Sequence, residues 1–419
     1  MSRSGRLVVI GLGYVGLPLA ERAAETGWSV TGLDSSMQTV TGLMSGHSHV
    51  DDISDVQVRA MLERGFRATT DESCLDDADV IVICVPTPLS LDGAPDLSAV
   101  RAAAEAVSRH VRAGQLVVLE STTYPGTTEE VLVPLLESTG LAVGVDLHCA
   151  FSPERIDPGN ANFTLVNTPK IVGGITAPCT ARAVEFYSSL VDRVVVAKGA
   201  REAEMTKLLE NTYRHVNIAL VNEMARFCHE LRIDLWDVIA CAETKPFGFS
   251  AFYPGPGVGG HCIPIDPNYL SHRVKTNLGF PFRFVELAQE INASMPAYVA
   301  RRVQDLLNDH SKPIKGSRAL LLGVTYKADI ADQRESPAAA VAAALQDLGA
   351  VVSFHDPLVD TWQVRDRDVD RVDDLDAAMH AADVVVLLQA HRQYRDLTPP
   401  DVPFLDTRGI LTGPGVTRL

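Results

Sequence analysis

A glycine-rich turn near the N-terminus limits most strongly what this chain can fold into. The short apolar segment RLVVI (residues 6–10) leads directly into GLGYVG (residues 11–16), which opens the helix-like stretch LPLAERAAETG. The strand-like segments WSVTGLD, DDADVIVICVPTP and GQLVVLESTTYPG follow, and the last two end in turn residues. This alternation predicts a doubly wound parallel sheet.

The last hundred residues repeat the same pattern. SRALLLGVTYK resembles the opening strand and turn, VVSFHDP resembles WSVTGLD, and AADVVVLLQAH resembles DDADVIVICVP. We predict a second Rossmann-like domain in this region. Its first turn keeps Gly323 but lacks the other glycines, so it is expected to hold something other than a dinucleotide.

The middle of the chain, residues 200–310, has a helical pattern. Residues 202–233 contain no Gly or Pro and carry apolar residues at close to helical spacing, which predicts one long helix. Such a helix either forms a dimer surface or is buried by its own domains. The predicted fold class is α/β, with two Rossmann-like doubly wound domains joined by a long central helix. The predicted domains are residues 1–199, 200–310 and 311–419.

The composition disfavours several classes of partner. The formal charge of −16 over 419 residues argues against nucleic acid and anionic membranes, which need clustered Lys and Arg. No apolar run reaches the roughly 18 residues of a spanning helix, and the first residues lack a signal-peptide layout. The seven cysteines form no CxxC pair, so neither a zinc site nor a disulfide framework is expected. We therefore expect a cytoplasmic protein without a bound metal.

The first glycine turn has the context of a dinucleotide site. Its glycines follow a strand and precede a helix, where a pyrophosphate binds at the helix N-terminus. Asp34 ends the second strand, where an acid binds ribose hydroxyls and repels a 2′-phosphate, so NAD is expected rather than NADP. The alternative is that the glycines only pack a strand against a helix. The residues expected at this site are Gly11, Gly13, Tyr14, Val15, Gly16 and Asp34, with Thr87 and Thr122 at the ends of later strands. The two threonines can equally be ordinary turn residues.

A second group of candidates surrounds one thiol. The stretch GPGVGGHCIPIDP (residues 255–267) places Cys262 beside His261, Asp266 and the backbone N–H groups of Gly259 and Gly260. A cysteine in polar surroundings with permissive backbone is a candidate nucleophile, whereas the alternative is a thiol that only fills the core.

Two further groups lie elsewhere in the chain. Lys207 and Asn211 are four residues apart on the predicted helix, so an amine and an amide donor project from one face and suit a developing oxyanion. The alternative is a solvated surface pair. The loop SPERIDPGN offers Glu154, Arg155 and Asp157 as an acid/base group or as a salt-bridged loop.

Seven blocks together resemble one family over essentially the whole chain. GLGYVGLPLA, ESTTYPGTTEE, SPERIDPGN, EMTKLLENTYRHVNIALVNE, GPGVGGHCIPIDP, TYKADIADQRESP and DTRG occur in the order and approximate spacing of the UDP-glucose/GDP-mannose dehydrogenase family. The resemblance implies an NAD domain, a central dimerisation helix and a C-terminal domain for the nucleotide sugar.

The resemblance also implies roles for individual residues. Cys262 is the nucleophile, Lys207 and Asn211 stabilise oxyanions, and Asp266 handles protons with Lys207. Glu154 assists hydrolysis of the covalent intermediate, and Thr122 orders a water near the nicotinamide. Arg334 reaches the cofactor pyrophosphate. The residues expected to bind substrate are Glu154, Arg155, Lys207, Asn211, Gly259, Lys327 and Arg408.

The expected activity is a four-electron, NAD-dependent oxidation of the C6 hydroxymethyl of a nucleoside-diphosphate hexose to a uronic acid, carried out by a homodimer. UDP-glucose and UDP-N-acetylhexosamines rank first as substrates, with dTDP-glucose as an alternative. The segment AETKPFGFSAFYPGPG resembles the N-acetylhexosamine branch, and Met37 replaces a basic residue that many relatives carry three positions after the ribose-binding acid. The alternative hypotheses are a two-electron sugar or hydroxy-acid dehydrogenase and a non-catalytic sensor of a nucleotide sugar or NAD.

Overall fold

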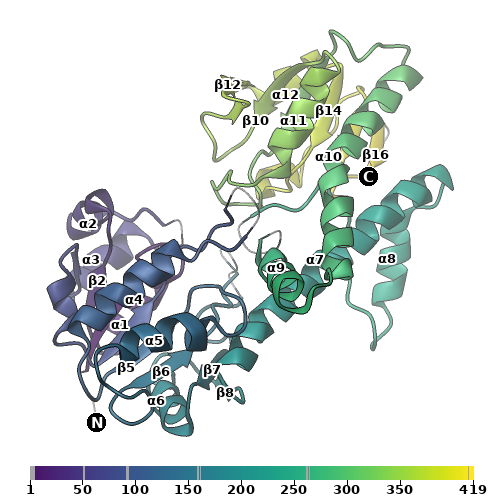
Figure 1. Ribbon diagram of the computed structural model, residues 1–419. Helices are drawn as coiled ribbons and strands as arrows, with labels where there is room; N and C mark the ends of the chain where they lie inside the picture. The colour runs from purple at the N-terminus through teal and green to yellow at the C-terminus, as the bar shows by residue number, and fades with distance from the viewer. Residues whose placement is uncertain are drawn as a thin grey trace. The chain divides into compact units, whose positions relative to one another are not determined.

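The computed structural model describes residues 5–50, 52–90, 94–157, 160, 162–260, 263, 265–413 and 415–419. His261 and Cys262 lie outside the described residues. The chain forms two compact units, of which the first comprises Met1–Glu210 and Asn268–Gly279 and the second comprises Asn211–Pro267 and Phe280–Leu419 (Figure 1). Along the described ranges, no helix is both long enough and apolar enough to cross a membrane.

The first unit is built on an eight-stranded sheet in the order β3-β2-β1-β4-β5-β6-β7-β8. Strands β1 to β6 are parallel, β7 runs antiparallel to β6, and β8 is parallel to β7. The strands are β1 (Arg6–Ile10), β2 (Ser29–Leu33), β3 (Arg67–Thr69), β4 (Val80–Ile83), β5 (Leu116–Leu119), β6 (His148–Phe151), β7 (Lys170–Gly174) and β8 (Val194–Val196). The helices before the long one are α1 (Gly16–Glu25), α2 (Met37–Met44), α3 (Asp55–Glu63), η1 (Glu72–Leu75), α4 (Ser98–His110), η2 (Thr128–Leu132), α5 (Val133–Glu137) and α6 (Ala177–Tyr187).

The sequence of the central strands explains their position in the sheet. Strands β4 (VIVI) and β5 (LVVL) are buried at every residue, as expected for parallel strands covered on both faces. Helix α1 buries Leu17, Leu19 and Ala20 against the sheet and leaves its polar face outside. The carboxyl ends of the strands therefore carry loops at one edge of the sheet, where open α/β sheets bind ligands.

The second unit contains a six-stranded parallel sheet in the order β13-β10-β9-β14-β15-β16. This order repeats that of the first six strands of the other sheet, which confirms the predicted second Rossmann-like fold. The strands are β9 (Arg318–Leu322), β10 (Val351–His355), β13 (Asp370–Arg371), β14 (Val384–Leu387), β15 (Phe404–Asp406) and β16 (Val416–Arg418), with the separate hairpin β11 (Gln363–Val364) and β12 (Arg367–Asp368). The accompanying helices are α11 (Pro337–Asp347), α12 (Leu375–Ala381) and η3 (Arg392–Tyr394).

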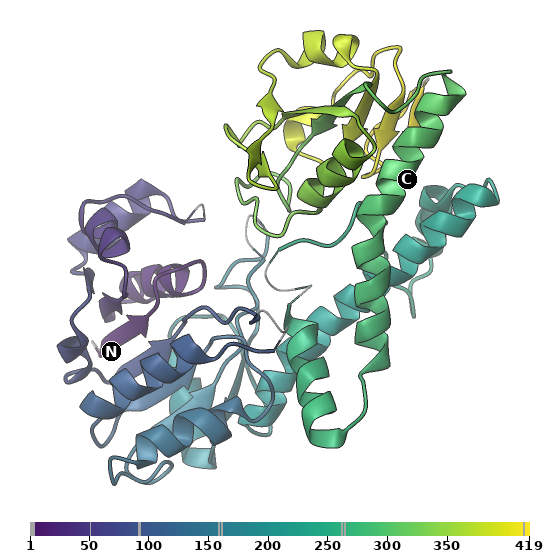
Figure 2. The ribbon, with the colours of Figure 1, turned by 45° about the horizontal axis from the view of Figure 1, so that its top comes forward.

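Helix α7 (Ala200–Glu230) is the long helix expected from the sequence. It is followed by α8 (Leu235–Glu243), α9 (Asp266–Leu278) and α10 (Arg283–Asp309), the last of which packs against α11 (Figure 2). The boundary between the two compact units falls inside α7, between Glu210 and Asn211. The α/β fold class with two mainly parallel sheets and a long helix is thus confirmed, while the division at residues 199 and 310 stays a prediction.

Candidate active site

Two of the three glycines of the first turn are explained by close backbone packing, and the third is not. Gly11 has φ +89°, and a Cβ there would lie 2.6 Å from the carbonyl oxygen of Cys84. A Cβ on Gly16 would lie 1.9 Å from the carbonyl oxygen of Gly11, so both glycines serve close backbone packing. A Cβ on Gly13 would meet no heavy atom within 4 Å. Packing therefore does not explain Gly13, and the open space beside it suits a ligand that approaches the backbone closely.

The surroundings of this turn favour an anion next to a ribose. Helix α1 begins after Val15 without a side-chain cap and has no acidic residue in its first turn, so its N-terminus favours a phosphate. The half-buried Asp34 carboxylate accepts hydrogen bonds from the backbone N–H groups of Leu12 (2.9 Å) and Ser36 (2.8 Å). These bonds hold an acid at the end of β2, where it can bind ribose hydroxyls. The turn therefore fits a dinucleotide such as NAD.

Two loops at the carboxyl edge of the first sheet are held by residues that the sequence analysis did not single out. The carbonyl of Thr87, in the loop after β4, accepts a hydrogen bond from the hydroxyl of Tyr269. Glu204 accepts from the backbone N–H of Gly126 and from both the backbone N–H (2.8 Å) and the hydroxyl (2.7 Å) of Thr128. Burial raises the pKa of Glu204 to about 7. Half-buried Thr122 lies in the loop that Glu204 anchors.

A buried charged cluster surrounds Glu154. The Lys170 ammonium lies 3.1 Å from Glu120 and 3.3 Å from Glu154, and all three side chains are buried. The hydroxyl of Tyr187 donates to Glu120 Oε1, whereas Glu120 Oε2 has no hydrogen-bond partner among the described residues. One lysine therefore faces two carboxylates inside the protein. Lys170 and Tyr187 belong to no sequence motif, and Glu120 is the first residue of the ESTTYPGTTEE block but had no expected role.

The cluster shifts the pKa values of its two acids in opposite directions. Burial alone would raise the pKa of Glu154, but the Lys170 ammonium, the backbone N–H of Ile156 and the Lys207 ammonium outweigh burial and hold this pKa below its usual range. Burial raises the pKa of Glu120, and the attraction of Lys170 does not fully offset it. Burial lowers the pKa of Lys170, but the two carboxylates hold it above its usual range. Glu154 is therefore the acid that stays ionised near neutral pH.

The other residues of the predicted acid/base loop have partners of their own. Arg155 pairs with Glu210 (2.7 Å) and donates to the carbonyl of Pro169 (2.6 Å). The amide of Asn160 donates to Asp157 (3.2 Å). The loop is thus salt-bridged, which was one of the two interpretations of its sequence. It also carries the ionised Glu154.

The residues expected on the long helix occupy one turn of α7. Lys207 is buried, and its charge acts on Glu154 within the first unit. In the second unit, the amide of Asn211 donates to the carboxylate of Asp266 (2.6 Å), and both side chains are buried. Asp266 is the first residue of α9, four positions after Cys262 in the sequence. The surface-pair alternative for Lys207 and Asn211 is therefore wrong, because neither side chain is solvated.

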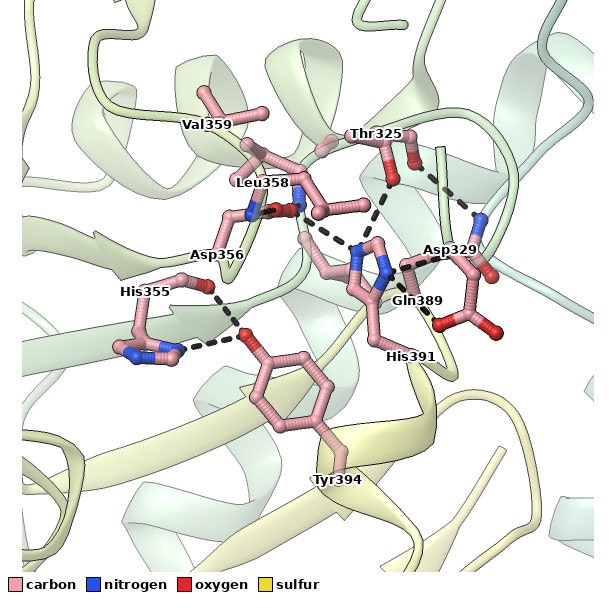
Figure 3. A network of polar contacts seen from close by, with 12 residues as sticks. Thr325, Asp329, His355, Asp356, Leu358, Val359, Gln389, His391 and Tyr394 are labelled. Atoms are coloured by element: carbon pink, nitrogen blue, oxygen red, sulfur yellow. Dashed lines mark hydrogen bonds and ion pairs between the residues drawn. The ribbon is translucent and has the colours of Figure 1, made fainter. Parts of the chain in front are cut away.

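The turn after β9 repeats the backbone geometry of the first glycine turn. The N–H of Gly323 donates to the carbonyl of His355 (2.9 Å), as Gly11 does to Leu33 (2.8 Å). The Asp356 carboxylate accepts from the N–H of Val324 (2.7 Å). This acid occupies the position of the ribose-binding acid in the other half. It is fully buried, however, and lies 3.1 Å from Nε2 of His391 (Figure 3).

The buried and hydrogen-bonded Asp356 explains why the second Rossmann-like domain does not suit a dinucleotide. Asp356 accepts three hydrogen bonds from the protein and is fully buried, so its carboxylate is not accessible to ribose hydroxyls. Burial alone would raise the pKa of Asp356, but the hydrogen bonds from His391, Leu358 and Val324 outweigh it and hold this pKa below its usual range. The turn after β9 lacks two of the glycines of the first turn, from which we expected that it holds something other than a dinucleotide. The buried Asp356 agrees with this expectation.

The candidate substrate residues Arg408 and Lys327 and the candidate cofactor residue Arg334 of the second unit lie in loops after strands. Arg408 follows β15, donates to the carbonyl of Leu388 (2.7 Å) and lies against Gly255, where a Cβ would come within 3.1 Å of the guanidinium. Burial lowers the pKa of Arg408 to about 10. Lys327 is half-buried in the loop after β9, and Arg334 pairs with Asp332 (2.6 Å).

Three family models match successive parts of the chain. They describe the UDP-glucose/GDP-mannose dehydrogenase family: its NAD binding domain matches residues 5–191, its central domain residues 201–294 and its UDP binding domain residues 320–413. The chain belongs to the UDP-glucose/GDP-mannose dehydrogenase family. It is thus an NAD-dependent nucleotide-sugar dehydrogenase, and its first glycine turn is part of the NAD-binding domain.

Relatives with known names cover nearly the whole chain. A UDP-N-acetyl-D-mannosamine dehydrogenase from Methanococcus maripaludis is 35% identical, with 95% of this chain and 88% of the relative covered. An NDP-N-acetyl-D-galactosaminuronic acid dehydrogenase from Ralstonia solanacearum is 35% identical, with 96% and 95% covered. The solved structure of UDP-D-ManNAc dehydrogenase from Pyrococcus horikoshii superposes with a TM-score of 0.89 at 34% identity, covering 99% of this chain and 98% of the other.

Proposed function

We propose that this enzyme oxidises the C6 hydroxymethyl of a nucleoside-diphosphate hexose through the aldehyde to the uronic acid, removing four electrons. The observation that carries the proposal is the buried Glu154, which Lys170 and Lys207 keep ionised. A two-electron dehydrogenase needs a base only for the proton of the alcohol. A four-electron enzyme also needs one for hydrolysis, because the covalent intermediate must be attacked by an activated water.

The proposed steps use the site residues in sequence. Bound NAD would supply the acceptor for the hydride that leaves C6 in each of the two oxidations. Between them the Cys262 thiolate adds to the aldehyde carbon, because an aldehyde has no hydride to give until a nucleophile has added. The second oxidation leaves a thioester, and a water activated by Glu154 then attacks it and releases the acid and the thiol.

Lys207 and Asn211 donate to the oxyanion at each stage, and Asp266 exchanges protons with Lys207. Thr122 orders the water.

The remaining roles concern ligand binding. Arg334 contacts the cofactor pyrophosphate, while Lys327 and Arg408 supply cations for the diphosphate of the sugar nucleotide. Arg155 and Gly259 line the sugar end. We rank UDP-N-acetylhexosamines first as substrates, since named relatives act on such sugars and the segment before Cys262 resembles that branch. UDP-glucose and dTDP-glucose follow.

An exposed apolar stripe on α7 supports the proposed homodimer. Tyr213, Leu220 and Phe227 recur every seven residues and are 49%, 53% and 47% exposed, and Leu231, directly after the end of α7, is also exposed. A regular row of exposed apolar side chains marks an interaction surface, and the same row on α7 of a second copy of the chain can pack against it. Light scattering should give a dimer for the unaltered chain and a monomer for Leu220→Glu/Phe227→Glu. A monomeric unaltered chain at micromolar concentration would reject the dimer.

The four-electron reaction is tested by stoichiometry. With limiting UDP-N-acetyl-D-mannosamine or UDP-glucose, about two NADH should form per sugar consumed, as two hydrides leave C6. Cys262→Ala should make no uronic acid, while slow aldehyde formation survives. Cys241→Ala removes an exposed thiol of α8 and should behave like the unaltered enzyme. One NADH per sugar, or normal acid production by Cys262→Ala, would contradict the proposal.

A further inference from the structure

His391 lies at the centre of a buried polar network to which none of the roles above assigns a purpose (Figure 3). Its Nδ1 is 2.9 Å from the backbone nitrogen of Asp329. Its Nε2 is 3.1 Å from the Asp356 carboxylate and 3.2 Å from the Thr325 hydroxyl. Thr325 and Asp329 are the two ends of the loop after β9 that contains Lys327. One imidazole thus contacts both ends of this loop.

The partners of His391 determine its tautomer. A backbone N–H only donates, so Nδ1 accepts from Asp329 and carries no proton. In the neutral ring, Nε2 carries the proton and donates to Asp356. The Thr325 hydroxyl donates to the carbonyl of Lys327 (2.8 Å), so its oxygen accepts from Nε2–H. The acceptor nitrogen of His391 therefore holds the far end of the loop, and the donor nitrogen holds its start.

The far end of the loop needs such support. Asp329 has φ +61°, a left-handed conformation that residues with a Cβ adopt rarely, although Asp is among those that tolerate it best. Its carboxylate accepts from the N–H of Arg392 (2.9 Å) and pairs with the guanidinium of that arginine (3.0 Å). Arg392 directly follows His391 in the sequence. The conformation of the loop is thus set from the segment around residue 391.

The same loop packs against the glycine-rich stretch that precedes Cys262. A Cβ on Gly260 would lie 2.8 Å from the Tyr326 ring, and a Cβ on Gly259 would lie 2.9 Å from Cβ of Tyr326 and 2.7 Å from the carbonyl oxygen of Glu335. The backbone of this stretch and the loop are therefore in direct contact. A shift of the loop would displace Lys327 together with the surface on which the glycines rest.

We propose that His391 is a positioning residue: by accepting the N–H of Asp329, it fixes the loop 325–329 so that Lys327 is set for the diphosphate of the nucleotide sugar. The inference rests on the substrate role proposed above for Lys327. His391 itself is fully buried, so in this proposal it acts through the loop and not on the substrate.

Two substitutions separate the two nitrogens of the ring. In His391→Asn, the amide oxygen lies near the place of Nδ1 and can still accept from Asp329. In His391→Gln, the amide nitrogen lies near the place of Nε2 and keeps the bond to Asp356, but the acceptor is lost. Titration calorimetry with UDP on the full chain should show affinity lowered roughly tenfold by His391→Gln, but within about twofold of the unaltered chain for His391→Asn. NAD affinity should be the same for all three.

A second measurement tests the loop without any ligand. Hydrogen exchange of the peptide that covers residues 325–332 should be faster in His391→Gln than in His391→Asn, and unchanged in His380→Gln, which alters an exposed histidine of α12. Equal exchange in the unaltered chain and His391→Gln overturns the proposal, and so does faster exchange with unchanged UDP affinity. If the unaltered chain binds NAD but neither UDP, dTDP nor GDP, the proposed function fails and this proposal with it, whereas the exchange data then show separately whether His391 holds the loop.

Discussion

The ammonium of Lys170 lies 3.3 Å from the carboxylate of Glu154, and neither side chain reaches solvent. The same ammonium lies 3.1 Å from Glu120, so one buried cation serves two buried acids. Only Glu154 also receives hydrogen bonds from backbone N–H groups, those of Arg155 (2.7 Å) and Ile156 (2.6 Å). This difference contributes to the lowered pKa of Glu154, whereas burial raises the pKa of Glu120. The charge of Lys170 therefore lowers the pKa of Glu154, the proposed base.

Replacing Lys170 with methionine should move the pH dependence of acid formation. Without the ammonium, burial dominates and the pKa of Glu154 rises, so the ionised base becomes available only at higher pH. We expect the rising limb of kcat to shift upward by at least about one pH unit. The measurement is kcat for uronic acid against pH.

Lys170→Arg is the matched control, since it retains the charge and should keep the limb near its original position. A Lys170→Met enzyme with reduced kcat but an unshifted limb would show that Lys170 is only structural. Removal of the cation also leaves a buried carboxylate unpaired, so Lys170→Met should lower the unfolding free energy by roughly 3–5 kcal/mol.

Cofactor choice should depend on Asp34. Its carboxylate repels a 2′-phosphate, so kcat/KM should favour NAD over NADP at least tenfold, about 1.4 kcal/mol. Asp34→Asn removes the charge but keeps an oxygen that can accept from Leu12, and it should reduce this preference. Steady-state kinetics with both cofactors decide the matter, and equal use of NAD and NADP by the unaltered enzyme would refute the role of Asp34.

Gly260→Ala should impair catalysis while leaving NAD binding intact. Gly260 has φ +85°, and the new methyl group would lie 2.8 Å from the Tyr326 ring, so the stretch before Cys262 must shift. We expect a loss of kcat of roughly tenfold or more, the size of effect that a misplacement of about 1 Å can have.

Gly248→Ala is the comparison for that variant. Gly248 also has positive φ (+69°), but a Cβ there meets nothing within 4 Å. It should therefore show the backbone cost of about 1 kcal/mol without the loss of kcat. If both variants lose activity equally, the clash with Tyr326 is not the cause.

The stability of the enzyme should depend on the protonation of Glu204. Burial raises its pKa from 4.5 to about 7, so between these values the native state holds a proton that the unfolded state has lost. Stability from this group is fully present below pH 4.5 and is lost as the pH rises towards 7. Glu204→Gln does not titrate, so its Tm should fall less over this interval than that of the unaltered chain. Thermal unfolding curves at several pH values test this, and parallel pH profiles of Tm would show that Glu204 contributes nothing to the slope.

The repeating elements could be predicted from the sequence because their signals are local. Strand β1, the glycine turn and α1 appear as an apolar run, three glycines and a helical period, and α7 appears as thirty residues without Gly or Pro. Asp34 was recognisable because its distance from the turn is fixed by the βαβ unit.

The supports of the site could not be predicted in the same way. Lys170 and Glu120 meet only because β5 and β7 lie in one sheet, fifty residues apart in the chain. His391 reaches Asp329 across sixty-two positions, and no spacing rule connects them. Such contacts depend on strand order and side-chain direction, which a single sequence does not display.

Helix α9 completes the packing of the NAD-binding unit, although it comes from a distant part of the chain. Residues 268–279 belong to the first unit, where Tyr269 bonds to the loop after β4 and Arg273 binds Glu130 (2.6 Å) and stacks on Tyr124 (4.7 Å to the ring centre). During synthesis the first two hundred residues leave the ribosome without this helix. The NAD-binding half therefore cannot complete its packing until about seventy further residues have been translated, and a fragment cut at the end of β8 would expose the two loops that α9 covers.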